Sequence, residues 1–287
     1  MKMLVETFTD TPTDTFSYVV YSEGQKECAV IDPVRGYDLR SGKTDTIGAD
    51  EILSFISRRG LQIEWLLETH MHADHLSCGA YIREQAGGKI AASEKIKTVQ
   101  AVFGALYNFD PDYYSADGLF DYLFADDEAF TIGAMPARAM YVPGHTPADL
   151  AYVVNNEAAF IGDTLFAPDL GTARCDFPGG DAEQLFASAQ RILSLPADTQ
   201  LYLCHDYPPA GRGRTSCVSV EKQRSENIHV RPGTDAASFV ELRRARDAAL
   251  AMPSLLLPSL QVNIRAGVLP EPANNGKRYL RIPLDEG

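Results

Sequence analysis

Residues 69–75 read Thr69-His70-Met71-His72-Ala73-Asp74-His75 and hold three of the six histidines in the chain. The preceding run, Ile63-Glu64-Trp65-Leu66-Leu67, is mostly apolar and predicts a short buried strand. In an extended loop His70 and His72 point the same way, because side-chain directions repeat every two residues. Imidazole and carboxylate groups are preferred ligands of Zn(II), Fe(II) and Mn(II). Folding alone gives no reason for three histidines at the end of a buried strand, so this stretch predicts a metal site.

Three later motifs each place one further candidate ligand at the end of a strand-like run. They are Val142-Pro143-Gly144-His145, Phe160-Ile161-Gly162-Asp163 and Leu201-Tyr202-Leu203-Cys204-His205. Pro and Gly favour a rigid turn that would hold His145. An aspartate at the end of an apolar strand is costly to bury unless it is paired or metal-bound. Alone, His145 could serve packing and Asp163 could cap a helix or turn; together with residues 70–75 they predict one metal site assembled from distant segments.

The 287-residue chain is 45% hydrophobic and 23% charged, a composition typical of a globular protein with a substantial core. Its formal net charge of −13 argues against a dedicated nucleic-acid surface and gives no attraction to an anionic membrane. No apolar run approaches the ~20 residues that span a bilayer, and the first residues lack a signal-peptide core. We therefore expect a cytoplasmic protein. The five cysteines are odd in number, widely spaced and without a CxxC pair, which predicts small buried thiols in a reducing compartment.

Apolar periodicity and turn residues divide the chain into strands followed by mixed strands and helices. We expect strands at residues 3–8, 16–22, 27–32, 63–67, 89–92, 128–132, 137–142, 150–154, 158–161 and 200–204. We expect helices at residues 49–60, 77–85, 94–104, 181–194, 216–228 and 235–250, and irregular chain at 34–48 and 108–118. No repeat or low-complexity linker divides the sequence. It predicts one α/β domain over residues 1–287, with helices outside a two-sheet core and residues 208–287 packed on it as a helical and tail extension.

The order of the candidate ligands resembles a known superfamily. His70-x-His72-x-Asp74-His75, followed by His145, Asp163 and His205, is similar to the metallo-β-lactamase superfamily over roughly residues 15–207. That resemblance implies an αββα sandwich with the metal at one edge, between the two sheets. The superfamily hosts several chemistries, so the fold does not determine the reaction.

Shorter motifs resemble the persulfide dioxygenases (sulfur dioxygenases). Thr69–His75 matches their THxHADH, Gly171–Phe177 is similar to their G-x-G-R-x-D-F, His205–Tyr207 matches their HDY, and Asn263–Gly267 is similar to their N-x-R-C-G. The sequence of residues 163–180 is similar to that of the bacterial β-lactamase-hydrolase-like branch. Ala173 and Ala266 depart from the glycine and cysteine that are usual at those positions, and residues 212–231 match poorly. These departures bear on the identity of the thiol carrier more than on the reaction.

The resemblance implies one non-haem Fe(II) per chain, held by His70, His145 and Asp163 as a two-His-one-carboxylate triad. The reaction would oxidise a thiol persulfide, such as glutathione persulfide, with O2 to sulfite and free thiol. His72, Asp74, His75 and His205 would form an outer shell or hold a second metal. Residues expected to bind the substrate are Arg174, Tyr207 and Arg265.

Other functions remain open at this stage. A dinuclear zinc thioester hydrolase of the glyoxalase II type uses all seven candidate ligands, and only Arg174-x-Asp176-Phe177 favours the dioxygenase. A β-lactamase and a non-enzymatic metal-binding module are weaker alternatives. Zinc, manganese or nickel could replace iron, and a homodimer is possible. His229 is expected on an exposed helix face, with a substrate contact as the alternative.

Overall fold

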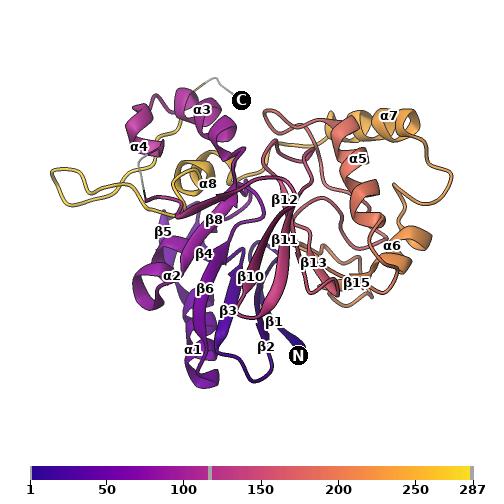
Figure 1. Ribbon diagram of the computed structural model, residues 1–287. Coiled ribbons are helices and arrows are strands. Elements are labelled where there is room, and N and C mark those ends of the chain that lie inside the picture. Colours follow the sequence, from indigo (N-terminus) through magenta and orange to yellow (C-terminus); the bar gives the residue numbers. More distant parts are fainter. Residues whose placement is uncertain (1, 116–117, 285–287) are drawn as a thin grey trace.

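Two six-stranded sheets form the centre of the computed structural model, which describes residues 2–115 and 118–284 (Figure 1). The first sheet has the order β1 (Met3–Asp10), β2 (Thr15–Ser22), β3 (Glu27–Ile31), β6 (Gln62–Leu67), β8 (Lys89–Ser93) and β9 (Tyr122–Phe124). The second has the order β10 (Glu128–Ile132), β11 (Met135–Tyr141), β12 (Leu150–Val154), β13 (Ala158–Phe160), β14 (Gln200–Tyr202) and β15 (Cys217–Ser219). A small sheet joins β5 (Lys43–Asp45), β4 (Val34–Asp38) and β7 (Leu76–Ser77).

Strand β2 shows why the sheets are covered on both faces. All eight of its residues are buried. Tyr18 and Val20 pack into the core between the sheets, together with Tyr152 and Phe160 of the second sheet. Their neighbour Val19 packs in the cluster on the opposite face. Because successive strand residues point to opposite faces, a run of apolar residues without polar alternation requires a buried layer on each side.

Helices supply those outer layers. Helices α1 (Ile47–Arg59) and α2 (Gly79–Ala86) contribute apolar residues to the cluster that covers the first sheet. Helices α5 (Ala182–Leu193), α6 (Val220–Glu226) and α7 (Ala236–Asp247) cover the second sheet. Helices α3 (Ile96–Leu106) and α8 (Leu256–Asn263) pack with Met71 and Phe177, and α4 (Pro111–Ser115) is a short helix beside α3 (Figure 1). The predicted αββα sandwich is confirmed.

In the second half of the chain, three helices begin at a residue whose side chain caps the helix N-terminus. The side chains of Asp181, Ser219 and Asp235 accept hydrogen bonds from backbone N–H groups at the starts of α5, α6 and α7. Such caps satisfy donors that have no partner inside the helix. The expected helices at 181–194 and 235–250 are therefore close to the observed ones.

Several segments differ from the expectation. Residues 217–219, expected at the start of a helix over 216–228, form the strand β15, so that α6 begins only at Val220, and β9 was not expected. Residues 34–48, expected to be irregular, contain the short strands β4 and β5, which pair with each other and with β7. The proline-containing tail contains α8, whose helix bonds are stabilised by burial of nearly every residue. Residues 111–115 form α4 within the segment 108–118, of which residues 116 and 117 lie outside the described chain. Short elements of this kind depend on tertiary contacts that local periodicity does not encode.

The sheet topology brings the candidate ligands to one edge. Strands β3, β6 and β8 run parallel in the first sheet. In the second sheet β13 and β14 are parallel, and β11 runs in their direction because two antiparallel pairings relate it to β13. The loops that follow the C-terminal ends of these strands therefore lie at the same edge of the two sheets; they come after β3, β6, β11, β13 and β14. All five cysteines are free, as expected, and no helix in the described chain is long and apolar enough to cross a bilayer.

Candidate metal centre

Seven predicted side chains meet at this edge, although they come from four loops. Asp163 lies at the centre of the group: its carboxylate oxygens are 4.0 Å from His70 Nε2, 3.7 Å from His145 Nε2 and 3.4 Å from His205 Nε2. Asp74 lies 3.2 Å from His205 Nε2. Donor atoms bound to one metal ion at about 2.1 Å stand roughly 3–4 Å apart. The spacing therefore fits metal binding.

The donor atoms form overlapping sets, because Asp163 belongs both to a group with His70 and His145 and to a group with Cys204 and His205. His70, His145 and Asp163 offer atoms that all lie within 4.8 Å of one another. A second set with the same spacing contains the four remaining candidates, which are His72, Asp74, His75 and His205. The resemblance implies His70, His145 and Asp163 as the iron ligands, and the structure brings these three side chains together.

Several side-chain nitrogen and oxygen atoms of these sets are buried without a hydrogen-bond partner in the described part of the chain. Among the described residues, no hydrogen-bond partner contacts Nε2 of His70, His75 and His205, Nδ1 of His72 or Oδ1 of Asp163. A buried polar atom without a partner costs about 1–3 kcal/mol. A divalent ion would satisfy these atoms, so the residues present fit a metal.

Burial also sets the protonation of the ligands. It lowers the pKa of His70 and His72 well below the usual value, and the neighbouring histidines act in the same direction. Burial raises the pKa of Asp163, although His205 and His145 oppose that rise. Neutral imidazole is the form that binds metals, and the charge of a bound cation would favour the carboxylate of Asp163.

His145 is oriented from behind. Its Nδ1 lies 2.7 Å from the backbone carbonyl oxygen of Arg174. A carbonyl can only accept, so Nδ1 carries the proton and Nε2 is free to bind a metal. The turn before His145 contains Gly144 at φ +141°, where an added Cβ would lie 2.3 Å from the backbone nitrogen of Leu185. Only glycine fits between this turn and α5.

His72 is oriented by two carboxylates that the sequence did not single out. Its Nε2 lies 3.1 Å from Asp32 Oδ1 and 3.7 Å from Glu68 Oε2. Asp32 also accepts hydrogen bonds from the backbone N–H and the hydroxyl of Thr69, at 2.7 Å each. The sequence pattern could have identified Asp32, because this residue follows an apolar strand just as Asp163 does.

The C-terminal helix braces the ligand loop. Asn263, at the end of α8, donates from Nδ2 to the carbonyl oxygens of His72 and His75, at 2.8 Å each. Its Oδ1 accepts a hydrogen bond from the backbone N–H of Ser77 at 2.7 Å. Asn263 was noted only as part of a motif. Its contacts show that the tail holds the backbone of residues 72–77.

A cavity of about 430 Å³ opens onto the two donor sets. Asp74, His145 and Asp163 line it on the metal side, and Leu250 and Pro253 line it opposite. Its positive side chains are Arg174, Arg243 and Arg246.

Arg174 and Tyr207 both line this cavity, as predicted from the motifs. The guanidinium of Arg174 forms two hydrogen bonds with Asp176, at 2.5 and 2.6 Å. The ring of Tyr207 stacks on His205 at 5.7 Å with an angle of 8° between the planes. Both side chains are placed where a substrate entering the cavity would meet them.

Two predicted roles are corrected. Arg265 is not among the residues that line the cavity: its guanidinium packs over the ring of Tyr113 and donates hydrogen bonds to the hydroxyl and carbonyl oxygens of that residue, at 3.0 Å each. His229 is not an exposed helix residue. It is buried in a turn after α6, where Nδ1 accepts a hydrogen bond from the backbone N–H of Thr172 at 3.0 Å. Both corrections arise because partners more than 50 residues away determine the surroundings of these side chains.

Comparisons with known proteins agree with this geometry. The model of the metallo-beta-lactamase superfamily matches residues 10–205. The chain is 50% identical to a metallo-hydrolase of Burkholderia pseudomallei (strain 1710b), named as probable, over 99% of both chains. It is 44% identical to glyoxylase B2 of Dictyostelium discoideum, over 99% of this chain and 98% of that one. It is 48% identical to a beta-lactamase hydrolase-like protein of Agrobacterium fabrum, covering 98% of this chain but 64% of that protein.

More distant relatives are named for the two functions that the motifs leave open, a glutathione thioester hydrolase and a persulfide dioxygenase. Hydroxyacylglutathione hydrolase of Methylococcus capsulatus is 31% identical over 87% of this chain and 81% of its own length. The mitochondrial persulfide dioxygenase of Homo sapiens is 29% identical over 88% and 85%. The crystal structure of ETHE1 from Myxococcus xanthus superposes with a TM-score of 0.74 at 22% identity, over 92% of this chain and all of that one, which supports the fold alone. The chain belongs to the metallo-β-lactamase superfamily, and its cluster of histidines and aspartates fits a divalent metal ion.

Proposed function

We propose that the protein is a persulfide dioxygenase with one Fe(II) held by His70, His145 and Asp163. The observation that carries this proposal is the set of two imidazoles and one carboxylate within 4.8 Å of one another. That donor set is typical of non-haem Fe(II) oxygenases, in which open coordination positions remain for substrates. Bound iron would supply the electrons that activate O2.

The overall reaction conserves atoms and electrons. A thiol persulfide, O2 and water give the free thiol and sulfurous acid, which ionises to sulfite. The outer sulfur is oxidised and O2 is reduced, so no further reductant is needed. The residues of the chain would bind the persulfide, orient its outer sulfur toward the three ligands and hold the product.

The cavity beside the ligands suits an anionic thiol such as glutathione persulfide. Arg174 and Arg246 line one part of it, and guanidinium groups bind carboxylates well; Arg243 lines it too, but its guanidinium is buried and paired with Asp247. Leu250 and Pro253 give the cavity an apolar part. Tyr207, which is 46% exposed, lines the same cavity, and its hydroxyl can donate or accept a hydrogen bond. We also propose a cytoplasmic location and a homodimer.

A second candidate is a dinuclear zinc hydrolase that cleaves a glutathione thioester. The observation in its favour is the set formed by His72, Asp74, His75 and His205, whose spacing also fits an ion. Relatives named glyoxylase B2 and hydroxyacylglutathione hydrolase agree with this alternative. The Arg174-x-Asp176-Phe177 segment, similar to that of the persulfide dioxygenases, leads us to prefer the first candidate.

Metal analysis of anaerobically purified protein, combined with oxygen uptake on glutathione persulfide, separates the candidates. One iron per chain, oxygen consumption and stoichiometric sulfite support the dioxygenase. Two zinc ions, no oxygen uptake and cleavage of a glutathione thioester contradict it.

The variant Asp163→Ala tests the ligand set directly. It should lose iron, because the carboxylate at the centre of both donor groups is removed. Asp198→Ala, at an exposed aspartate in the loop before β14, is the matched control and should keep its iron. Wild-type iron content and turnover in Asp163→Ala would exclude Asp163 as a ligand.

A further inference from the structure

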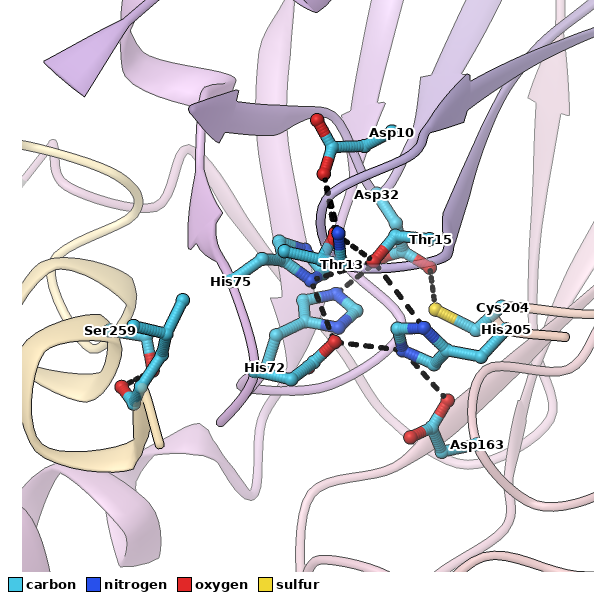
Figure 2. A network of polar contacts seen from close by, with 12 residues as sticks. Asp10, Thr13, Thr15, Asp32, His72, His75, Asp163, Cys204, His205 and Ser259 are labelled. Carbon is cyan, nitrogen blue, oxygen red and sulfur yellow. Dashed lines mark hydrogen bonds and ion pairs between the residues drawn. The ribbon is translucent and has the colours of Figure 1, made fainter. Parts of the chain in front are cut away.

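A line of hydroxyl groups connects the β1–β2 turn to the second donor set (Figure 2). Thr13 Oγ1 donates to Asp10 Oδ2 at 2.6 Å, and it lies 2.8 Å from Thr15 Oγ1. Thr15 Oγ1 in turn lies 3.4 Å from His75 Nδ1 and 3.3 Å from His205 Nδ1. One hydroxyl therefore contacts the rear nitrogens of two proposed ligands at once.

The direction of these hydrogen bonds follows from counting protons. An ionised aspartate has no proton to donate, so Thr13 must give its own to Asp10. Thr13 then offers only lone pairs to Thr15, and Thr15 must use its single proton toward Thr13. If Thr15 instead donated to a histidine, two oxygen lone pairs would face each other at 2.8 Å. Thr15 can therefore only accept from the rings of His75 and His205.

An acceptor behind a ring nitrogen fixes the tautomer of a neutral histidine. Nδ1 of His75 and His205 then carries the proton, and Nε2 carries the lone pair. Both Nε2 atoms are buried and without a hydrogen-bond partner among the described residues. His205 Nε2 lies 3.2 Å from a carboxylate oxygen of Asp74 and 3.4 Å from Asp163 Oδ1; Figure 2 shows the contact with Asp163.

We propose that Thr15 is a positioning residue that holds His75 and His205 in their Nδ1-protonated tautomers, with Thr13 and Asp10 fixing its direction, so that both Nε2 atoms remain free to bind a divalent ion. The carboxylate of Asp74 lies 3.4 Å from His75 Nδ1 and supports the same tautomer there. At His205 the hydroxyl of Thr15 is the side-chain acceptor. The backbone carbonyl of Asp14 also accepts from the His205 ring, so each ring keeps one other acceptor when Thr15 is replaced, and we expect effects of similar size at both.

The backbone holds Thr15 in register with the ligand loop. Thr15 forms an isolated β-bridge with His205. The backbone N–H of Phe16 donates to the carbonyl oxygen of Cys204 at 2.8 Å. The hydroxyl of Thr15 is completely buried, so no solvent competes for its bonds. Position 15 thus links the start of β2 to the end of β14.

The test compares Thr15→Val with Thr15→Ser in the full-length chain. Valine keeps the shape of threonine but removes the hydroxyl, whereas serine keeps the acceptor. Thr199→Val is the matched control, because the Thr199 hydroxyl is buried, has no partner and contacts no histidine. Zinc is the probe ion, and its affinity is measured by competition with a chelator. Burial lowers the pKa of His205, but Asp74 and Asp163 outweigh this effect and raise that pKa in the metal-free protein. Nitrogen-15 NMR of the histidine rings is therefore recorded at a pH high enough to keep them neutral, where it reports the tautomers.

In Thr15→Val we expect zinc bound by the second donor set to be weakened about 10–100-fold, as is typical when such supporting residues are removed. The Nδ1-protonated signal of His205 should fall in the same variant. Thr15→Ser should restore both, and Thr199→Val should change neither.

Two outcomes would overturn the role of Thr15. One is an unchanged His205 tautomer in Thr15→Val; the other is an equal loss of zinc in Thr15→Val and Thr15→Ser. This role depends on the metal site that both candidate functions share. Failure to consume oxygen with glutathione persulfide would reject the dioxygenase and leave the zinc and NMR results unaffected.

Discussion

Replacing Asp247 by asparagine should destabilise the wall of the cavity through a single buried charge. Asp247 and Arg243 are 5% and 3% exposed and form an ion pair on α7. Asp247 Oδ1 accepts from Arg243 Nε at 2.9 Å, and Oδ2 accepts from the backbone N–H of Cys175 at 2.9 Å. Arg243 also donates to the carbonyl oxygen of Thr172 at 3.2 Å. The pair therefore attaches residues 172–175 to α7.

The magnitude follows from the burial of both partners. Removing one member of a buried ion pair costs about 3–5 kcal/mol, because the other charge stays buried without compensation. Asparagine retains an oxygen for the N–H of Cys175, so the loss comes mainly from the charge. We expect about 3 kcal/mol, a large part of a typical stability of about 5–15 kcal/mol. For a chain of this size the melting temperature should fall by roughly 6–12 °C.

Urea unfolding of a double-mutant cycle measures this energy. The variants are Asp247→Asn, Arg243→Met and the double variant, in which no buried charge remains. The double variant should be more stable than Asp247→Asn by at least about 1 kcal/mol. Loss of under ~1 kcal/mol in Asp247→Asn, or additive losses in the double variant, would refute the reasoning.

Three further predictions concern other parts of the chain. In His229→Asn, the free energy of unfolding should depend less on pH. Burial lowers the pKa of His229 to about 4, so the wild type is fully stabilised above about pH 6.5 and loses up to about 3 kcal/mol as the pH falls toward 4. Asparagine keeps an acceptor for the N–H of Thr172 and cannot titrate. Urea unfolding at pH 7 and pH 4.5 measures the difference. Gly144→Ala should lower both stability and iron content, because the new Cβ would meet the backbone of Leu185 at 2.3 Å. Arg174→Ala should raise KM for glutathione persulfide with a smaller effect on kcat, as steady-state oxygen uptake would show.

Each of these has a contrary result. Equal pH dependence in wild type and His229→Asn would show that other groups cause the acid loss. Wild-type stability of Gly144→Ala would mean that the turn before His145 can move. An unchanged KM in Arg174→Ala would show that its contact with Asp176, and not the substrate, occupies the guanidinium.

The candidate ligands could be predicted from the sequence because each is a local feature. A polar residue directly after an apolar strand is visible in a few letters, as at Asp163 and His205. Three histidines within residues 70–75 needed no knowledge of the fold. The same logic applies to Asp32, which also ends an apolar strand but lies in no histidine-rich motif and was not singled out.

The roles of Arg265 and His229 could not be predicted, because long-range partners decide them. Arg265 has a motif in its favour, yet it bonds Tyr113, 152 residues away in the sequence. His229 lies at the end of a helix-like pattern, yet it is buried against Thr172, 57 residues away. Contacts at such separations follow from the packing of elements, which hydrophobic periodicity does not report.

The sequence by itself determined the sandwich fold, the superfamily and the seven side chains that can bind a metal. These depend on residue type, strand pattern and order along the chain. Only the tertiary structure decided how far apart the seven side chains lie and which atoms orient them. The reason is that a ligand's tautomer and direction depend on the group behind it, and for His205 one such group is Thr15, 190 residues away in the sequence and in contact only after folding.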